Sequence, residues 1–293
     1  MLLKFEPIAL EKVWGGNNLK KTYKIDKENI GEIWGISAHE SYSNKIINTR
    51  FAGKTLRELF IKEKYLFGNL SVQEFPVLFK VIDAADDLSV QVHPQDEYAL
   101  KHESSHGKDE CWYILETHSK NTEIIIGHHA KTKAELTHMI ENNQYESLLN
   151  RFKIKPKDYF YIPSGKVHAI CKNTTLLEVS QSSNVTYRLY DYNRLDKGKL
   201  RELHVEKSLD VILVPDTELK RVHDDKYFYF EVFDSKEDKE YKADVYGDYF
   251  YCIKGSGEIN AEEVKAGDFF MISSETVYQV KGSLKLARVR IKA

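Results

Sequence analysis

Four residues that could bind a metal ion lie in three short segments of this 293-residue chain. Gln91 and His93 alternate with valines in the segment LSVQVHP, so a β-strand would turn both polar side chains to the same face. Glu110 lies in a second strand-like segment, KDECWY, and His168 ends the turn motif PSGKVH. A PxGxxH motif preceded by a strand is typical of metal sites in β-barrels. We therefore expect these four side chains to converge in a barrel interior.

The types of donor atom restrict which ion this site would bind. Two imidazoles, one carboxylate and one amide oxygen, without a thiolate, suit Zn²⁺, Mn²⁺, Fe²⁺ or Co²⁺. Such a site leaves a coordination position open for a substrate. Cys111, Cys171 and Cys252 lie far apart and form no CxxC pair, which predicts buried free thiols in a reducing cytoplasm. We expect one divalent ion per chain.

The segments that contain the candidate ligands should be strands, because the pattern of most of the chain predicts short β-strands separated by turns. Two segments differ from this pattern. Thr55 with Glu58, and Thr132 with Glu135, have the spacing of a capping box, which predicts a helix start at each place. Apolar residues at helical spacing follow both, and the second helical segment is expected to reach about Asn150.

The chain also contains an internal repeat. The segment KPKDYFYIPSGKVH, which ends at His168, resembles KAGDFFMISSETVY, which ends at Tyr278. Upstream, KDECWYILE resembles GDYFYCIKG, and this match places Tyr249 at the position of Glu110. Tyrosines would then replace two of the candidate ligands in the second copy. A copy of this kind should support the fold without binding a metal ion.

The repeat predicts two β-barrel lobes of unequal size. The first lobe, residues 1–215, would bind the metal ion and would contain a helical insertion near residues 132–150. The second lobe, residues 216–293, would be metal-free. One metal site per chain follows from this division.

Composition excludes several classes of partner. The 43 basic and 45 acidic residues give a net charge of −2 and are spread along the chain, which does not favour binding to nucleic acid or to an anionic membrane. No apolar run has the length of a membrane span, and the first residues lack the pattern of a signal peptide. We expect a cytoplasmic protein, and nothing in the sequence indicates an oligomeric state.

Seven motifs, in order, resemble the short bacterial form of the type I mannose-6-phosphate isomerases, a family of the cupin superfamily. The resemblance extends over about residues 1–215 and rests on VWGG (13–16), GEIWGISAHE (31–40), SVQVHPQDEYA (89–99), GKDECWYIL (107–115), PSGKVHAI (163–170), TYRLYDYNR (186–194) and RELHVEKSLDVI (201–212). It implies a mainly β fold of two cupin-type β-barrel, or jelly-roll, lobes, the first with a short helical insertion. It also implies that zinc is the ion.

The resemblance implies roles for individual residues. The family's zinc ligands fall on the residues that strand alternation and the turn motif select, namely Gln91, His93, Glu110 and His168. Its catalytic arginine falls on Arg188, its active-site serine and lysine on Ser89 and Lys108, and its downstream acidic residue on Glu178. Asp109 stands where other members often carry Thr or Pro.

The implied activity is the interconversion of mannose 6-phosphate and fructose 6-phosphate through an enediolate. Arg188 would stabilise the developing negative charge, and either Lys108, with a pKa lowered by a neighbouring cation, or Glu178 would carry the proton. Two alternatives stay open. Two histidines and a carboxylate also suit a non-heme iron oxygenase, and a cupin can bind a sugar without catalysis. A neutral glutamine ligand near an arginine and a lysine favours an anionic sugar phosphate over the oxygenase. The presence of Lys108 and Arg188 counts against a non-catalytic cupin.

Overall fold

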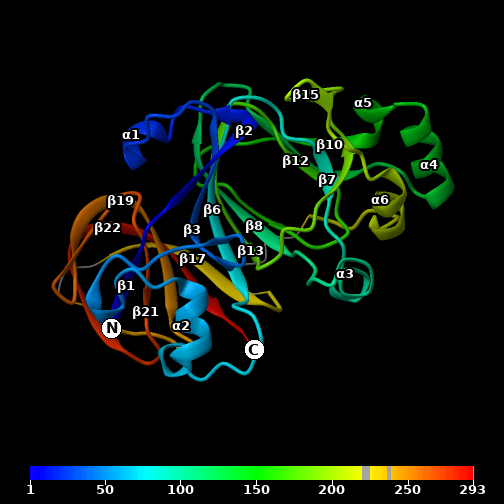
Figure 1. The fold of residues 1–293 in the computed structure, drawn as a ribbon. Helices are drawn as coiled ribbons and strands as arrows, with labels where there is room; N and C mark the ends of the chain where they lie inside the picture. Colours follow the sequence, from blue (N-terminus) through cyan, green and yellow to red (C-terminus); the bar gives the residue numbers. More distant parts are fainter. Residues whose placement is uncertain (220–224, 236–238, 293) are drawn as a thin grey trace.

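Three large antiparallel β-sheets form most of the computed structural model, which describes residues 1–219, 225–235 and 239–292 (Figure 1). In spatial order, the six-stranded sheet contains β11 (Tyr159–Ile162), β8 (Glu110–Thr117), β13 (Thr174–Gln181), β6 (Val77–Ala84), β2 (Ile8–Gly16) and β3 (Ile30–Ile36). The five-stranded sheet contains β10 (Leu149–Lys153), β9 (Glu123–His128), β12 (His168–Ile170), β7 (Val90–Val92) and β14 (Tyr187–Tyr190). The prediction of a mainly β fold is confirmed.

The third sheet is built mainly from the C-terminal part of the chain. Its strands are, in spatial order, β1 (Leu2–Phe5), β21 (Phe269–Ile272), β19 (Asp248–Ile259), β22 (Val277–Ile291) and β17 (Phe228–Asp234). Two further strands, β18 (Glu240–Lys242) and β20 (Glu262–Lys265), pair with β22 and β19. Because β1 pairs with β21 in register from Leu2 to Phe5, the N-terminus belongs to this sheet and not to the first lobe in which the sequence division placed it.

The helices are short and lie outside the sheets. The predicted insertion forms α4 (Lys133–Glu141) and α5 (Tyr145–Leu148), which cover the outer face of the five-stranded sheet together with α6 (Val205–Val211) (Figure 1). The other elements are α1 (Lys20–Tyr23), α2 (Leu56–Lys62), α3 (Asp96–Glu103), 3₁₀ turns at Thr49–Phe51 and Lys64–Phe67, and the hairpins β4 (Ala38–His39)–β5 (Tyr42–Ser43) and β15 (Leu195–Asp196)–β16 (Lys199–Leu200). No helix among the described residues is long and apolar enough to span a membrane.

The two predicted capping boxes differ in the structure. At α2, the Thr55 side chain accepts from Glu58 N, and Glu58 Oε2 accepts from Thr55 N at 2.8 Å, so the box is complete. At α4, the Thr132 side chain accepts from Glu135 N, but the Glu135 carboxylate accepts from Lys131 N instead. The second box was therefore only half right, although the helix start was predicted correctly.

The six-stranded sheet is packed on both faces. On its inner face, Trp112 belongs to the same apolar cluster as Ile126 of the five-stranded sheet. On its outer face, Val179 packs in a cluster with Phe230 and Val289 of the third sheet. Every residue of β3, β6 and β13 is buried for this reason. Charged residues on these strands consequently lie in an interior, where they must be paired.

Strand register defines the internal repeat more closely than sequence comparison does. In the first copy, Ile162 of β11 pairs with Glu110 of β8, and in the second copy Ile272 of β21 pairs with Asp248 of β19. Asp248, not Tyr249, is therefore the counterpart of Glu110. The upstream match was wrong by one residue because aromatic residues on neighbouring positions of these strands look alike in sequence. Tyr278 keeps its place as the counterpart of His168.

Candidate metal centre and active site

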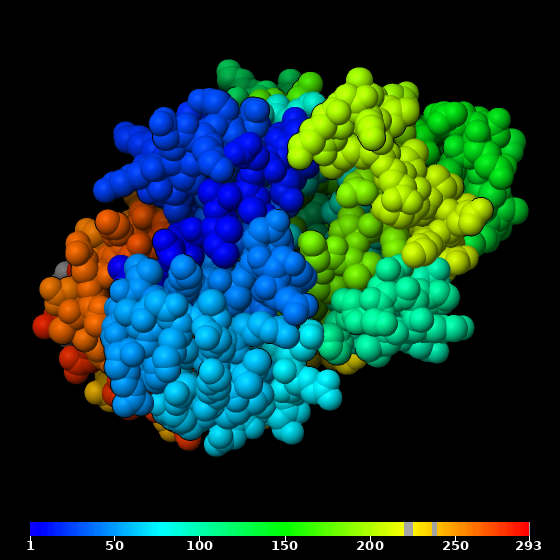
Figure 2. All heavy atoms as spheres, in the orientation of Figure 1, coloured from blue at the N-terminus to red at the C-terminus, as the bar shows by residue number. Residues whose placement is uncertain are grey.

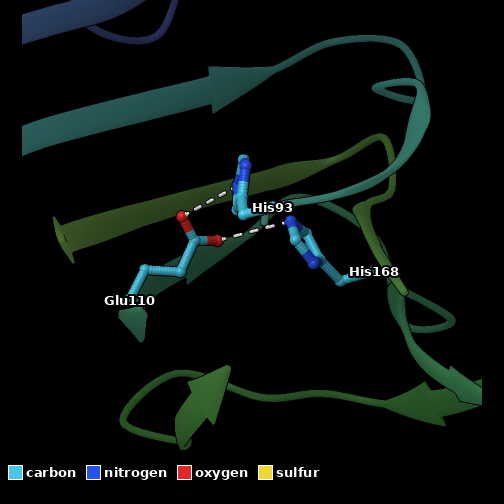
Figure 3. Close-up of side chains that lie close together, drawn as sticks. All are labelled: His93, Glu110 and His168. Carbon is cyan, nitrogen blue, oxygen red and sulfur yellow. Dashed lines mark ion pairs between the residues drawn. The ribbon is translucent and has the colours of Figure 1, made fainter. Parts of the chain in front are cut away.

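Three buried side chains from both sheets of the first lobe meet in its interior (Figure 3). His168 is the first residue of β12, His93 follows β7, and Glu110 begins β8 on the opposite sheet. Glu110 Oε2 lies 3.4 Å from His93 Nε2, and Glu110 Oε1 lies 3.6 Å from His168 Nε2. One ligand atom from each residue fits within 4.8 Å of the others. The sequence motifs predicted that these three side chains would converge, and the structure brings them together.

Backbone carbonyls orient both imidazole rings. His93 Nδ1 donates to Val185 O, and His168 Nδ1 donates to Lys166 O, each at 2.8 Å. Both Nε2 atoms are thereby left as acceptors that face Glu110. Burial lowers the pKa of both histidines, and, with the repulsion of Lys108, lowers that of His93 to about 4. Neutral imidazoles with a fixed tautomer are the form that binds metal ions.

The turn before His168 depends on its glycine. Gly165 has φ +84°, a conformation that L side chains rarely adopt, and a Cβ there would lie 2.8 Å from Leu213 Cγ. Gly165 N also donates to His93 O at 2.8 Å, which connects the turn to the second ligand. The PxGxxH spacing therefore fixes His168 through backbone geometry.

The donor set fits a divalent ion. Glu110 Oε1 is buried and has no hydrogen-bond partner among the described residues, which is costly for a carboxylate oxygen unless a cation binds it. The Gln91 side chain lies beside the cluster, with its Nε2 atom 3.3 Å from His168 Nε2. A half-turn of this amide about its last bond would place the oxygen there instead. These four residues could therefore hold the ion with nitrogen and oxygen ligands only.

Lys108 lies between the cluster and a second carboxylate. Its Nζ atom contacts Glu110 and lies 3.3 Å from both Glu178 Oε1 and His93 Nε2. Burial favours the neutral amine, but the charges of Glu110 and Glu178 outweigh it and raise the pKa of Lys108. The raised pKa that the protein groups alone give Lys108 is opposite to the lowered pKa expected from the sequence. A lowered value would require a bound cation to outweigh both carboxylates.

The charges continue as a row along neighbouring strands. Lys80 of β6 lies 3.6 Å from Glu178 of β13, and Lys12 of β2 lies 3.1 Å from Glu32 of β3. Burial alone would raise the pKa of Glu32, but the charges of Lys80 and Lys12 have the larger effect and lower it to about 2. Sequence reasoning missed Lys12, Glu32 and Lys80. The signal was present for the last two, because each is a charged residue flanked by apolar residues in a strand segment.

A pocket of about 360 Å³ opens above this row. Figure 2 looks onto the hollow between the N-terminal segments, in blue, and the segment near residue 200, in yellow-green. Its wall contains the predicted residues Ser89, Gln91, Lys108, Glu178 and Arg188. His93, Glu110 and His168 lie deeper and are almost completely buried. Two further wall residues, Arg201 and His204, were not predicted as site residues, although both lie in the motif RELHVEKSLDVI.

Arg188 has an unusual environment for a half-buried arginine. Its Nη1 atom donates to Glu202 O at 3.3 Å, and no carboxylate of the described residues lies within ion-pair distance. Asp191, its neighbour in sequence, instead accepts two hydrogen bonds from Arg201, at 2.7 and 2.5 Å. Burial, together with the charge of Arg201, lowers the pKa of Arg188. Arg188 therefore forms no ion pair with Asp191.

Two facing antiparallel sheets with a His–Glu–His cluster between them define the chain as a cupin with the ligand set of a metal site. Comparison with known proteins narrows this class. Residues 2–132 match the family model described as phosphomannose isomerase type I, catalytic domain. Mannose-6-phosphate isomerase ManA of Bacillus subtilis is 51% identical over 216 residues, which cover 73% of this chain and 68% of that protein.

Two further comparisons agree. The mannose-6-phosphate isomerase of Streptococcus mutans is 46% identical over 217 residues, which cover 71% of this chain and 68% of that protein. The crystal structure of the mannose 6-phosphate isomerase from Bacillus subtilis superposes with a TM-score of 0.91 at 37% identity and covers 99% of both chains. The chain belongs to the type I mannose-6-phosphate isomerase family. Neither the iron oxygenase nor the non-catalytic sugar-binding protein is supported by these comparisons.

Proposed function

We propose that this protein interconverts mannose 6-phosphate and fructose 6-phosphate, and that it does so with one divalent ion, zinc in the first instance. The observation that carries the proposal is the buried row in which Lys108 lies between the His–Glu–His cluster and Glu178, at the base of a pocket that contains Arg188. A metal site alone would fit many reactions. A metal site fits proton transfer on an anionic sugar when it lies beside a lysine–carboxylate pair and beside an arginine that has no carboxylate partner among the described residues.

The ion would be held by His93, Glu110, His168 and the Gln91 amide oxygen. When bound, it supplies Lewis-acid stabilisation of negative charge on sugar oxygens. Its supporting groups are already oriented, because backbone carbonyls fix both imidazoles. Zinc suits two imidazoles with oxygen ligands, and the same set also accepts manganese, iron or cobalt.

Glu178 and Lys108 divide the proton transfers between them. Isomerisation moves one proton from C2 to C1 and another between the two oxygens on these carbons, so the protein ends unchanged. Glu178 lines the pocket as a hydrogen-bond acceptor and is suited to carry the carbon-bound proton. Lys108, which donates to two carboxylates, is held as an ammonium and is suited to donate toward a sugar oxygen. Of the two bases considered from sequence, Glu178 is therefore preferred.

Arg188 and Arg201 would receive the negative charge of the substrate. Arg201 is held in place by Asp191, whereas Arg188 keeps its guanidinium available toward the pocket. A planar guanidinium can donate two parallel hydrogen bonds to a phosphate or to an enediolate oxygen. Ser89, buried beside Gln91, completes the wall with a hydroxyl group.

An isomerase assay on mannose 6-phosphate, before and after chelation, tests the proposal. We expect turnover with one zinc per chain, loss of turnover after chelation and recovery on addition of zinc. His168→Ala should lose both metal and turnover, whereas His118→Ala, a change outside the pocket, should keep both. Full turnover of the metal-free protein would refute the proposal.

A further inference from the structure

We propose that Asp216, in the segment that joins the two lobes, is a positioning residue for the metal centre. It would act through Lys166, whose backbone carbonyl orients the His168 ring. This inference rests on the proposed metal site. It adds a residue that is 48 positions from His168 in the chain and belongs to no strand or helix.

Both ends of Lys166 are fixed. Its Nζ atom donates to Asp216 Oδ1 and to Thr217 O, both at 2.6 Å, and its side chain is only 2% exposed. Its carbonyl oxygen accepts from His168 Nδ1 at 2.8 Å. One residue therefore connects the joining segment at its side chain with a ligand imidazole at its backbone. Displacement of the Lys166 side chain would move the carbonyl that sets the ring orientation.

Asp216 lies close to the backbone of Gly127 and His128, at the end of β9. Its Oδ2 atom accepts from His128 N at 3.3 Å, and a Cβ on Gly127 would lie 2.0 Å from the same oxygen. Leu213 N donates to Gly165 O at 3.0 Å, within the turn that leads to His168. The joining segment thus packs against the metal-binding turn itself. A glycine at position 127 is what allows the carboxylate to approach this closely.

Charge gives Asp216 a second effect on the site. Lys166 is a buried cation two residues from a metal ligand, and Asp216 is its ion-pair partner. Without that partner, the ammonium would remain buried and uncompensated, which is strongly unfavourable. It would also repel a divalent ion bound at His168. Loss of Asp216 should therefore weaken metal binding both through geometry and through charge.

Zinc affinity of the metal-free protein, measured by chelator competition, tests this role. Asp216→Asn should raise the zinc Kd by about 10- to 100-fold, the usual effect of losing a partner that supports a metal ligand. The matched control is Asp234→Asn, which removes an exposed aspartate from an ion pair with Lys285 in the second lobe and should leave the Kd unchanged. An equal Kd for the wild type and Asp216→Asn would overturn the inference. A wild type that binds no zinc would instead overturn the proposed function.

A double variant separates positioning from charge and also covers a failure of Asp216→Asn to fold. Lys166→Met with Asp216→Leu removes both charges together, so that no buried charge is left unpaired, although His128 N and Thr217 O each lose one hydrogen bond. If Asp216 positions His168 through Lys166, this variant should fold and still bind zinc at least tenfold more weakly than the wild type. Wild-type affinity in the double variant would show that Asp216 only balances a charge, and positioning would be refuted.

Discussion

Arg188 lies on β14 between Tyr187 and Leu189, and it is the residue of that strand that lines the pocket. We expect Arg188→Ala to keep its fold and its zinc while turnover falls by on the order of 10²–10³, the usual effect of losing one preorganised donor. Arg188→Lys should recover only part of the loss, because an ammonium cannot replace a planar fork.

Kinetic constants and metal content should be measured on the same samples, with Arg151→Ala as a control for loss of a half-exposed arginine. A fall in kcat would assign Arg188 to charge that develops during the reaction. A rise in KM with kcat unchanged would assign it to binding of the phosphate. Normal kcat and KM with full zinc would leave it a structural residue.

At the residue scale, alternation and motif were enough to select His93, Glu110 and His168, because a strand fixes the side of every second residue. The environment of Lys108 could not be obtained in the same way. Its pKa depends on Glu178, which reaches it from another strand at a sequence distance of 70 residues. Charged residues flanked by apolar residues in a strand, such as Lys80, are a signal that could have been used.

At the scale of elements, the two helices with a side-chain cap were predicted, and α5 fell inside the second predicted segment. The helices α1, α3 and α6, which have no side-chain cap, were missed. α3 has Gln95 at its N-cap position and no side-chain cap, and Ala99 is its one buried residue, so it has neither a start signal nor an apolar stripe. α6, which follows His204 at the N-cap position, likewise has no side-chain cap. Both helices are held by tertiary contacts, and their sequences alone do not specify them.

The complete capping box of α2 gives a prediction about stability alone. Thr55→Ala should lower the free energy of unfolding by about 1 kcal/mol, because one helix N–H loses its acceptor. Turnover should not change, since α2 packs in the cluster between the six-stranded and third sheets and not at the pocket. Urea denaturation and the isomerase assay on the same protein measure both quantities. A change in kcat without a change in stability would contradict this assignment.

At the scale of the whole molecule, the second lobe keeps a carboxylate where the first has Glu110. Asp248 is buried and forms ion pairs with Arg288 at 3.2 Å and Arg290 at 2.8 Å, and Tyr278 Oη donates to it at 3.2 Å. By strand register, Arg288 also stands where the first lobe has Glu178. Guanidinium groups therefore neutralise the carboxylate in this lobe. The comparison of the two repeat copies in sequence missed Asp248 as the counterpart of Glu110, because its alignment was shifted by one residue.

We expect Tyr278→Phe to leave metal content at one equivalent per chain and to lower stability by about 1 kcal/mol, the value of one hydrogen bond. Metal analysis and thermal unfolding of the same samples test both parts. His168→Ala, the change at the equivalent position of the first lobe, serves as the comparison and should lose the metal. Two equivalents in the wild type, or loss of zinc in Tyr278→Phe, would show that the second lobe binds a metal ion.

Stability should also depend on pH through Asp225, at the contact between the lobes. Burial, with a smaller contribution from the Asp109 carboxylate, raises the pKa of Asp225 to about 6, although two backbone hydrogen bonds act to lower it. The folded state binds the proton of the Asp225 carboxyl more tightly than the unfolded chain does. The contribution of this group to stability is therefore complete below about pH 4. The contribution is lost as pH rises through about 6.

The difference in stability between the wild type and Asp225→Asn, measured by urea denaturation from pH 4 to pH 7, isolates this group. The wild type should lose about 2–3 kcal/mol relative to the variant over that range. The other titratable groups near it remain in both proteins and cancel in the comparison: Asp109, Lys292, Tyr159, Tyr161 and Cys111. Parallel profiles would show that the carboxyl group has an ordinary pKa.

The row of charges below the pocket has a consequence for how a substrate arrives. Its positive members, Lys12, Lys80 and Lys108, alternate with negative members, Glu32, Glu178 and Glu110. Alternating charges cancel beyond a short distance, and the net charge of −2 exerts no pull on a dianion. The row itself should therefore attract an anion only at contact range, where the anion meets each charge singly. Attraction from farther away would come from Arg188, whose charge has no carboxylate partner among the described residues.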